Sequence, residues 1–313
     1  MKRYDDWQGL APDARGAAAA VGNFDGVHLG HRAVIDRAGA MAGRLDAPLG
    51  VVTFEPHPRE VFVPDTPPFR LTGPEARAHR LETLGVATLI ELPFDARLAA
   101  LSPERFVAEV LSGGLGLSGA VVGADFRFGK GRAGDAEGLR RLGNEAGMDV
   151  EVLELVAGEA GRVSSSAIRT ALSEGRPRDA AGMLGHWHRI EGPVLHGDAR
   201  GRTLGYPTAN MALDGLHPPR FGVYAVLVDV LTGPLAGTRR GGVASLGIRP
   251  MFRQPAPTIE TVLLDFEGDL YGAHLSVALV AFLREEARFD GIDALIRQME
   301  SDTAAARAAL TDV

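Results

Sequence analysis

Apolar and polar positions alternate in two different ways along this chain, and the change falls near residue 185. In the first part, short apolar runs typical of buried strands are each followed by residues at helical spacing. The strand-like runs lie at residues 17–21, 49–54, 86–92, 120–123 and 150–156. Helical patterns begin near residues 34, 72, 102, 135, 164 and 177. This alternation predicts an α/β domain with a parallel sheet covered on both faces.

The second part has a different pattern. Its strand-like runs lie at residues 189–195, 223–230, 242–246, 258–266 and 275–283, with no helical pattern between them. Turn signals such as L-T-G-P and E-G-D separate several runs, which is typical of an antiparallel barrel or sandwich. One helix closes the chain, with its apolar residues from Ile292 to Met299 on one face. We therefore expect two domains, residues 1–184 and residues 185–313.

Composition excludes several classes of protein. The 313 residues suffice for two domains, and 45% hydrophobic with 23% charged residues is ordinary for a globular chain. Cysteine is absent, so disulfides, thiolate zinc sites, iron–sulfur clusters and cysteine nucleophiles are excluded. The net charge of -7 argues against non-specific electrostatic binding to nucleic-acid phosphates or to an anionic membrane.

Membrane and export signals are also missing from the sequence pattern. No apolar run approaches the roughly 20 residues that a bilayer-spanning helix needs, and the run at residues 277–283 ends at Arg284. The opening residues M-K-R-Y-D-D have no apolar segment of a signal peptide behind them. We expect a cytoplasmic protein.

A glycine-rich loop, G-N-F-D-G-V-H-L-G-H at residues 22–31, joins the first predicted strand to the first helix. In a doubly wound sheet this is the carboxyl end of a strand, where ligands bind, and the helix N-terminus offers free N–H groups to an anion. His28 and His31 are three residues apart, so both can project from one side of the first turn and donate to phosphate oxygens.

A histidine pair at this spacing can also be an ordinary surface or core pair. A metal site is a third alternative, but the sequence has no third ligand nearby and no H-E-x-x-H pattern. The position between strand and helix, the flanking glycines and the Asn and Asp within the loop favour a nucleotide site.

Three further segments of the first part carry polar side chains that can meet a nucleotide. Serines at residues 164–166 open a predicted helix, with Arg169 in the next turn, so this group can cap the helix and clamp phosphates. Asp125 follows a predicted strand and can face a ligand or hold Mg²⁺. The ordinary alternatives are a helix cap, a solvated arginine, a turn aspartate and, for His57 between two prolines, a rigid loop.

The second part contains a basic, glycine-rich loop that ends in P-T-A-N at residues 207–210. It is neither a Walker A loop nor a protein-kinase loop. Thr208 and Asn210 offer oxygen ligands suited to Mg²⁺, although such residues usually form a turn. Glu260 lies in a strand-like apolar run, where a carboxylate either faces solvent or is a positioned base.

Taken together, these motifs resemble the bacterial bifunctional riboflavin kinase/FAD synthetase family. The first loop is similar to the H-x-G-H signature of the nucleotidyltransferase superfamily, and its longer form is similar to this family specifically. T-F-E-P-H-P, G-A-D-F-R-F-G, V-S-S-S-A-I-R and the P-T-A-N run follow in the family's order, at residues 53–58, 123–129, 163–169 and 207–210. The resemblance extends from about residue 17 to the last helix.

The resemblance implies a Rossmann-like nucleotidyltransferase domain with a parallel sheet, followed by a small antiparallel β-barrel riboflavin kinase domain with a C-terminal helix. It implies phosphorylation of riboflavin by ATP to FMN and ADP, then adenylyl transfer from ATP to FMN, which gives FAD and pyrophosphate. Mg²⁺ is the implied cofactor. The implied partners are these small molecules, without nucleic acid or membrane, for a monomer or weak homo-oligomer.

The resemblance also implies a role for each matching residue. Catalytic roles fall to His28 and His31 in adenylyl transfer and to Glu260 as the base that deprotonates the ribityl 5′-hydroxyl. The implied ATP site of the adenylyltransferase comprises Gly22, Asn23, Phe24, Asp25, Gly30, Ser164, Ser165, Ser166 and Arg169. The implied flavin site there comprises His57, Asp125 and Arg127. The implied ATP and Mg²⁺ site of the kinase comprises Gly201, Arg202, Thr203, Gly205, Pro207, Thr208 and Asn210. The implied metal ligands are Thr208, Asn210 and Asp125.

Some positions depart from the family pattern. Ser166 replaces the usual Thr and keeps its hydroxyl, while Ala199, Ser245 and Ile248 stand where Gly, Asn and Thr are common. These three departures bear on loop mobility and flavin affinity but leave the reaction type unchanged. The alternatives are an enzyme with one inactive half, a flavin-binding or regulatory module without turnover, and a nucleic-acid role, which the acidic balance disfavours.

Overall fold

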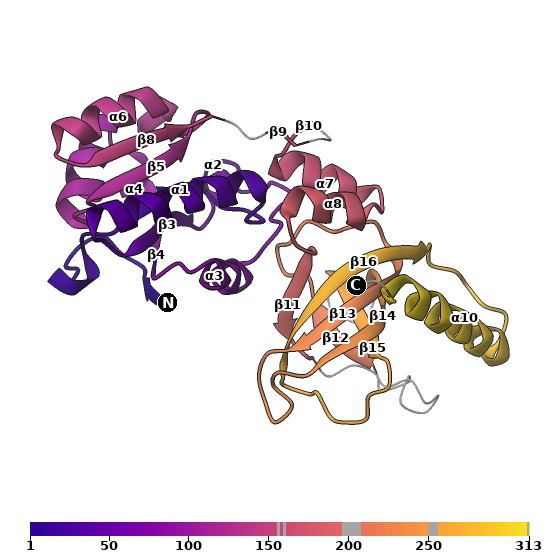
Figure 1. The fold of residues 1–313 in the computed structure, drawn as a ribbon. Coiled ribbons are helices and arrows are strands. Elements are labelled where there is room, and N and C mark those ends of the chain that lie inside the picture. Colours follow the sequence, from indigo (N-terminus) through magenta and orange to yellow (C-terminus); the bar gives the residue numbers. More distant parts are fainter. Residues whose placement is uncertain (155–156, 159–160, 196–207, 250–255, 312) are drawn as a thin grey trace. The chain divides into compact units, whose positions relative to one another are not determined.

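The computed structural model describes residues 1–154, 157–158, 161–195, 208–249, 256–311 and 313, and Figure 1 shows its ribbon. The chain forms two compact units, one of Met1–Thr66 with Arg77–Ser164 and one of Pro67–Ala76 with Ser165–Val313. Helices α7 (Ser165–Ser173) and α8 (Pro177–Leu184) belong by their contacts to the second unit. The sequence pattern instead assigns them to the first domain, and the boundary at residue 184 stays a prediction.

The first unit contains a six-stranded sheet in the order β1-β4-β3-β2-β5-β8, and every neighbouring pair is parallel. The strands are β1 (Lys2–Tyr4), β2 (Ala18–Val21), β3 (Leu49–Glu55), β4 (Thr88–Pro93), β5 (Gly119–Gly123) and β8 (Asp149–Leu153). The parallel sheet expected from the sequence is confirmed. Strand β1 was not expected, because its polar residues are largely exposed and give no apolar run.

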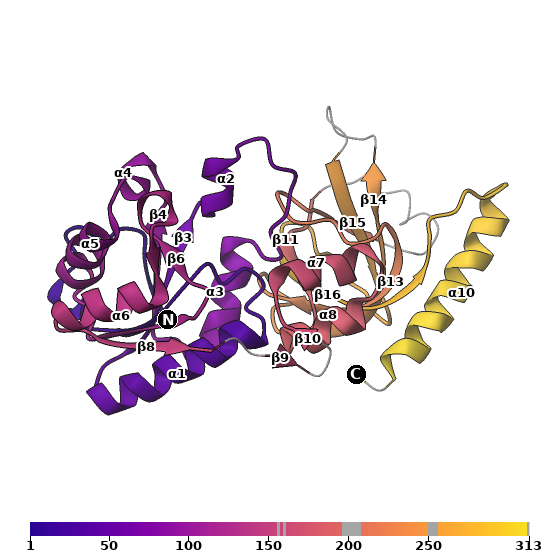
Figure 2. The same ribbon diagram turned by 90° about the horizontal axis from the view of Figure 1, so that it is seen from above.

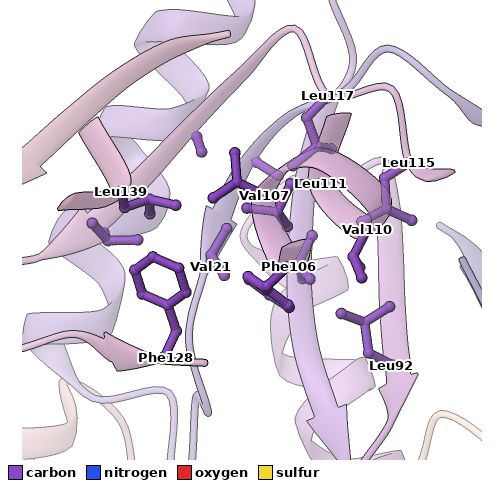
Figure 3. Close-up of a cluster of buried hydrophobic side chains, with 14 of the residues drawn as sticks. Val21, Leu92, Phe106, Val107, Val110, Leu111, Leu115, Leu117, Phe128 and Leu139 are labelled. Atoms are coloured by element: carbon purple, nitrogen blue, oxygen red, sulfur yellow. The ribbon is translucent and has the colours of Figure 1, made fainter. Parts of the chain in front are cut away.

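Helices cover both faces of this sheet. On one face, α1 (Leu29–Leu45) packs Ile35, Ala38 and Met41 against strand residues, together with Leu81 of α3 (Pro74–Thr83). On the other face lie α5 (Pro103–Arg105), the π-helix η2 (Phe106–Gly114) and α6 (Ala136–Glu145). Figure 3 shows the core beneath them, where Phe106, Val107, Val110 and Leu111 of the π-helix pack around Val21 and Leu92 of the sheet.

Short elements connect these parts. They are η1 (Pro12–Ala14), α2 (Pro58–Phe62), α4 (Ala96–Ala99), β6 (Arg127–Phe128), η3 (Lys130–Arg132), β7 (Gly134–Asp135), β9 (Ala157–Gly158) and β10 (Gly161–Arg162). Within the described ranges, no helix is both long and apolar enough to cross a membrane.

The second unit is built on six antiparallel strands in the order β11-β16-β13-β14-β15-β12. The strands are β11 (Arg189–Pro193), β12 (Thr208–Ala212), β13 (Gly222–Val230), β14 (Arg239–Arg249), β15 (Ala256–Leu263) and β16 (His274–Arg284). An antiparallel bridge between Leu195 and Asn210 brings the two edges together, so the sheet is a nearly closed barrel. The expected small antiparallel barrel is confirmed.

The C-terminal helix α10 (Ile292–Leu310) contacts β13, β14 and β16, and Figure 2 shows it beside the barrel. Asp302, on its buried face, accepts hydrogen bonds from the guanidinium of Arg284 at 2.7–3.2 Å. Not all of the apolar face expected from the sequence is covered, because Ile292 at the first turn is 59% exposed.

Candidate active sites

The loop between β2 and α1 has an unusual backbone held in place by buried side chains. Phe24 and Val27 have φ angles of 51° and 42°, and positive φ is rare for such residues. Both side chains are only 1% exposed and belong to the core beneath α1. The hydroxyl of Thr53 donates to the carbonyl of Asn23 at 3.2 Å. Backbone conformations of this kind persist where packing enforces them, often at ligand sites.

His28 is the N-cap of α1, and its ring is buried. The backbone N–H of His31 donates to Nδ1 of His28 at 3.2 Å. Because Nδ1 is the acceptor, the neutral ring carries its proton on Nε2, which is left as a donor. Burial lowers the pKa of His28 to about 4, against smaller opposing effects from a backbone hydrogen bond and the Asp125 charge. The geometry therefore provides a neutral N–H donor at the helix N-terminus.

The ring of His31 stacks on that of His28, with centroids 3.6 Å apart and an angle of 11° between planes. Burial, and then the neighbouring His28, hold the pKa of His31 well below its usual value. Its buried Nδ1 has no hydrogen-bond partner among the described residues. Two stacked neutral imidazoles thus lie where the helix offers its free N–H groups, which suits an anionic ligand.

Asp125 is brought close to this pair. It follows β5, the neighbour of β2 in the sheet, and its charge raises the pKa of His28. Arg127 lies two residues further on and forms an exposed ion pair with Asp135 at 3.2 Å. The carboxyl ends of two adjacent parallel strands therefore bring together the two histidines and an exposed carboxylate.

His57 has a structural role that the sequence analysis did not find. It is the N-cap of α2, where its Nδ1 accepts from the N–H of Arg59 at 3.1 Å. Glu60 in turn accepts from the N–H of His57 at 3.1 Å, which completes a capping box. The sequence signal for this capping box is a Glu three residues after the N-cap, together with a Pro in the first turn of the helix. The pattern was not recognised because His57 stands at the N-cap, where Ser or Thr is usual.

The serine helix belongs to the second unit, whereas His28 and His31 belong to the first. Ser164 ends the first unit, and Ser165 and Ser166 open α7.

On α7, Arg169 is fixed rather than freely solvated. It donates to the hydroxyl of Ser166 at 3.2 Å and to the carbonyl of Phe69 at 3.3 Å. His217 adds a contact from its Nε2 to the Arg169 carbonyl at 3.1 Å. Phe69 and His217 have no sequence signal, because they lie 100 and 48 residues away from Arg169 along the chain.

In the barrel, strand register places three polar residues in one row. Asn210 on β12 lies opposite Glu260 on β15, and Glu260 lies opposite Ser245 on β14. Directly opposed residues share one face of a sheet. The alternate residues of these strands, such as Met211 and Ile259, fill the barrel core, so the row lies on the other face.

Thr208 belongs to the same face as Asn210, two positions along β12, and its hydroxyl accepts from the Asn210 amide at 3.4 Å. Thr208, Asn210 and Glu260 are all half-buried. Their hydroxyl, amide and carboxylate oxygens are hard donors of the kind that Mg²⁺ prefers. The other kinase residues named from the sequence, Gly201, Arg202, Thr203, Gly205 and Pro207, lie outside the described residues, as does Ala199.

Asp125, the third metal ligand named from the sequence, belongs to the first unit. Across the described residues, His, Asp and Glu side chains form no group of three or more that could hold a metal ion.

The described residues include two polar centres, His28 with His31 in the first unit and Glu260 with Asn210 in the second. One has the neutral Nε2–H donor of His28 at a helix N-terminus, and the other has a carboxylate beside hard oxygen donors. Ring N–H donors and hard oxygen donors are of the kinds that bind phosphate groups and their metal ions.

Comparisons with known proteins match each of the two parts of the chain to a different family model. A family model described as FAD synthetase matches residues 10–167, and one described as riboflavin kinase matches residues 184–310. A bifunctional riboflavin kinase/FMN adenylyltransferase of Pseudomonas fluorescens is 43% identical over 303 residues, which cover 96% of this chain and 94% of that protein. One from Bacillus subtilis is 38% identical over 289 residues, covering 90% and 89%. The chain belongs to the bifunctional riboflavin kinase/FMN adenylyltransferase family.

A solved structure shares the whole fold. It is titled a macrolide-efflux protein from Streptococcus pneumoniae, has a TM-score of 0.83 at 30% sequence identity, and the match covers 97% of this chain and 98% of that one. The order of an α/β unit followed by an antiparallel barrel is therefore shared with an independent structure.

Proposed function

We propose that this chain makes FAD from riboflavin in two ATP-dependent steps. The barrel unit phosphorylates riboflavin to FMN and releases ADP. The α/β unit transfers AMP from a second ATP to FMN, which yields FAD and pyrophosphate. The observation that carries the proposal is the presence of one polar centre in each unit, of the kind that each step requires, in a chain whose two halves match the two families.

In the kinase step, Glu260 accepts the proton of the ribityl 5′-hydroxyl, and that oxygen attacks the γ-phosphorus of ATP in line. Asn210 lies beside Glu260 in the strand register, so the phosphate-binding side of the site adjoins the base. Thr208 and Asn210 hold the metal-bound nucleotide, with Gly201, Arg202, Thr203, Gly205 and Pro207 completing its site. Bound Mg²⁺ supplies positive charge to the phosphate oxygens.

In the adenylyl step, a phosphate oxygen of FMN attacks the α-phosphorus of ATP, and pyrophosphate leaves. The Nε2–H of His28 and the ring of His31 stabilise the charge that builds on the phosphate oxygens. The loop residues Gly22, Asn23, Phe24, Asp25 and Gly30 bind ATP, together with Ser164, Ser165, Ser166 and Arg169. FMN binds near His57, Asp125 and Arg127, and Asp125 is the metal ligand of this site. No covalent intermediate with the protein is required, because each step is a direct displacement.

The proposal extends to the setting of the enzyme. We place the domain boundary at residue 184, and expect a cytoplasmic monomer or weak homo-oligomer whose partners are small molecules rather than nucleic acid or membrane. The two alternatives are an enzyme with one inactive half and a flavin-binding module without turnover. Glu260 beside Asn210 and the stacked His28 and His31 support turnover at both sites, since binding alone needs neither arrangement.

The test is a time course with purified protein, riboflavin, excess ATP and Mg²⁺, with the flavins separated by chromatography. We expect FMN to appear first and FAD to follow. Accumulation of FMN alone would show that the histidine site is inactive. If neither product forms, and supplied FMN is not converted either, the chain is a binding module and the proposal is wrong.

A further inference from the structure

A second carboxylate lies against the face of the barrel that holds Glu260. Gly247 on β14 is approached so closely by Glu286 that the position a Cβ would occupy is 2.8 Å from the carboxyl carbon and 2.9 Å from Oε2. Glu286 follows β16 and comes from a different part of the chain. The missing side chain at Gly247 therefore leaves the room in which this carboxylate lies.

The carboxylate and Glu260 share one face of the sheet. Gly247 is two residues after Ser245, which lies opposite Glu260, so a Cβ at Gly247 would project from the same face as Glu260. Gly247 itself lies opposite Thr258 and is a diagonal neighbour of Glu260. Such neighbours are about 7–8 Å apart between Cα atoms. Long acidic side chains at that spacing reach the same small ligand.

A buried hydroxyl lies between them without a partner. Thr258 is 6% exposed, and its Oγ1 makes no hydrogen bond within the described part of the chain. It projects from the Glu260 face, since it is two residues before Glu260 on β15. Buried hydroxyls are normally satisfied, so an unpaired one beside a proposed catalytic base indicates a place for a ligand group.

Glu286 has no ion-pair partner among the described residues, unlike its neighbours in sequence. Glu285 pairs with Arg220, and Arg284 pairs with Asp302. No hydrogen bond or ion pair joins Glu286 to another residue in the part of the chain that the structure describes. Its exposed carboxylate thus lies against Gly247 and is available as an acceptor.

We propose that Glu286, with Thr258, binds the hydroxyl groups of the polyol chain of the phosphoryl acceptor. This inference rests on the proposed kinase activity of the barrel. A carboxylate accepts from two hydroxyls, and a threonine hydroxyl donates and accepts. The middle hydroxyls of the polyol bind Glu286 and Thr258. The polyol then passes along β15 and presents its terminal hydroxyl to Glu260. Glu286 is a positioning and specificity-determining residue, and Glu260 remains the base.

The test compares riboflavin with lumiflavin, the same ring system without the polyol chain. Glu286→Gln should raise the KM for riboflavin by about tenfold or more, since a hydrogen bond to a charged group is worth a factor of about ten to a hundred. The kcat should change much less. Inhibition by lumiflavin should be the same in variant and wild type, because lumiflavin has no hydroxyls to lose.

Gly247→Ala tests the same contact without removing the carboxylate. The added methyl group displaces the flexible end of Glu286 and should give the same rise in KM. In the double variant the two effects should not add, because each removes the same interaction. Glu285→Gln is the matched control and should leave the KM unchanged. Conversion of supplied FMN to FAD should be unchanged in every variant, which shows that the α/β unit is folded, and the retained kcat for riboflavin shows that the barrel unit is folded.

Three results would overturn the proposal. An unchanged KM for riboflavin in Glu286→Gln would show that the carboxylate contacts no part of the acceptor. An equal loss of lumiflavin inhibition would place Glu286 at the ring rather than the polyol chain. A shift in Mg²⁺ dependence with no change for riboflavin would make it a metal ligand. If the wild type makes no FMN at all, the proposed function fails instead, and the two failures are distinguishable.

Discussion

At the scale of single residues, the proposed adenylyl site depends on one hydrogen bond. The backbone N–H of His31 occupies Nδ1 of His28, which fixes the tautomer, and burial keeps the ring neutral. A neutral donor strengthens its hydrogen bond as charge builds on a phosphate oxygen, and it needs no proton transfer. We therefore expect His28 to act as a preset donor rather than as an acid or base.

The charge state of His28 can be measured directly. Because burial lowers its pKa to about 4, its ring should remain neutral at pH 5.5, where an ordinary histidine is mostly protonated. An NMR titration of the ring protons, with His28→Gln to assign the signal, should give a midpoint near 4. A midpoint near the usual value would show that the ring is solvated and would contradict this account.

Gly30 is required by the His28 ring. A Cβ at Gly30 would lie 3.1 Å from Cε1 and 3.2 Å from Nδ1 of His28, closer than ordinary contact. Gly30→Ala should displace the ring and lower the rate of FAD formation by about tenfold to a hundredfold, the usual cost of a small misplacement at a reacting centre. FMN formation should be unchanged.

Gly43 supplies the control on the same helix. A Cβ there meets no atom within 4 Å, so Gly43→Ala should leave both activities intact. It should also stabilise α1 by about 0.5–1 kcal/mol. Equal losses of FAD formation in the two variants would show that helix composition, not the ring contact, sets the rate.

At the scale of elements, the residue before β11 is a buried histidine that should make the barrel sensitive to acid. His188 is 2% exposed, its Nε2 has no partner among the described residues, and burial lowers its pKa to about 3. Between about pH 6.5 and 3 the unfolded chain binds a proton that the folded chain does not. The free energy of unfolding therefore falls as the pH falls, by about 1.4 kcal/mol per unit.

Replacing this side chain should remove that dependence. His188→Leu should lose about 1.4 kcal/mol less stability than the parent chain between pH 7.5 and pH 5.5. Urea unfolding followed by the fluorescence of Trp187, with Trp7→Phe in both chains, reports the barrel unit. The same acid loss in both chains would show that other groups determine the pH dependence.

The elements that the sequence predicted are those with strong periodicity. Both sheets followed from apolar runs, and the π-helix buries Phe106 and Val110 as its pattern required. Strand β1 was missed because its exposed residues have no such pattern, and α2 was missed because its cap is His57. The Asn210–Glu260–Ser245 row depends on strand register, which pairs residues distant in sequence and leaves no local signal.

At the scale of the whole molecule, each unit has its own core and its own polar centre. The motifs around His28 and Glu260 could be found from sequence because each is a short run beside one strand. The residues that hold Arg169, namely Phe69 and His217, could not, because they come together only through the fold. Because His28 and Glu260 lie in different units, we expect two activities that can be lost separately.

The most direct test of two separate sites is complementation by mixing. His28→Ala should stop FAD formation and leave FMN formation intact, while Glu260→Gln should stop FMN formation and still convert supplied FMN. Neither variant alone should make FAD from riboflavin, but an equimolar mixture should, because FMN released by the first is adenylylated by the second. Loss of both activities in either variant would contradict the division of function.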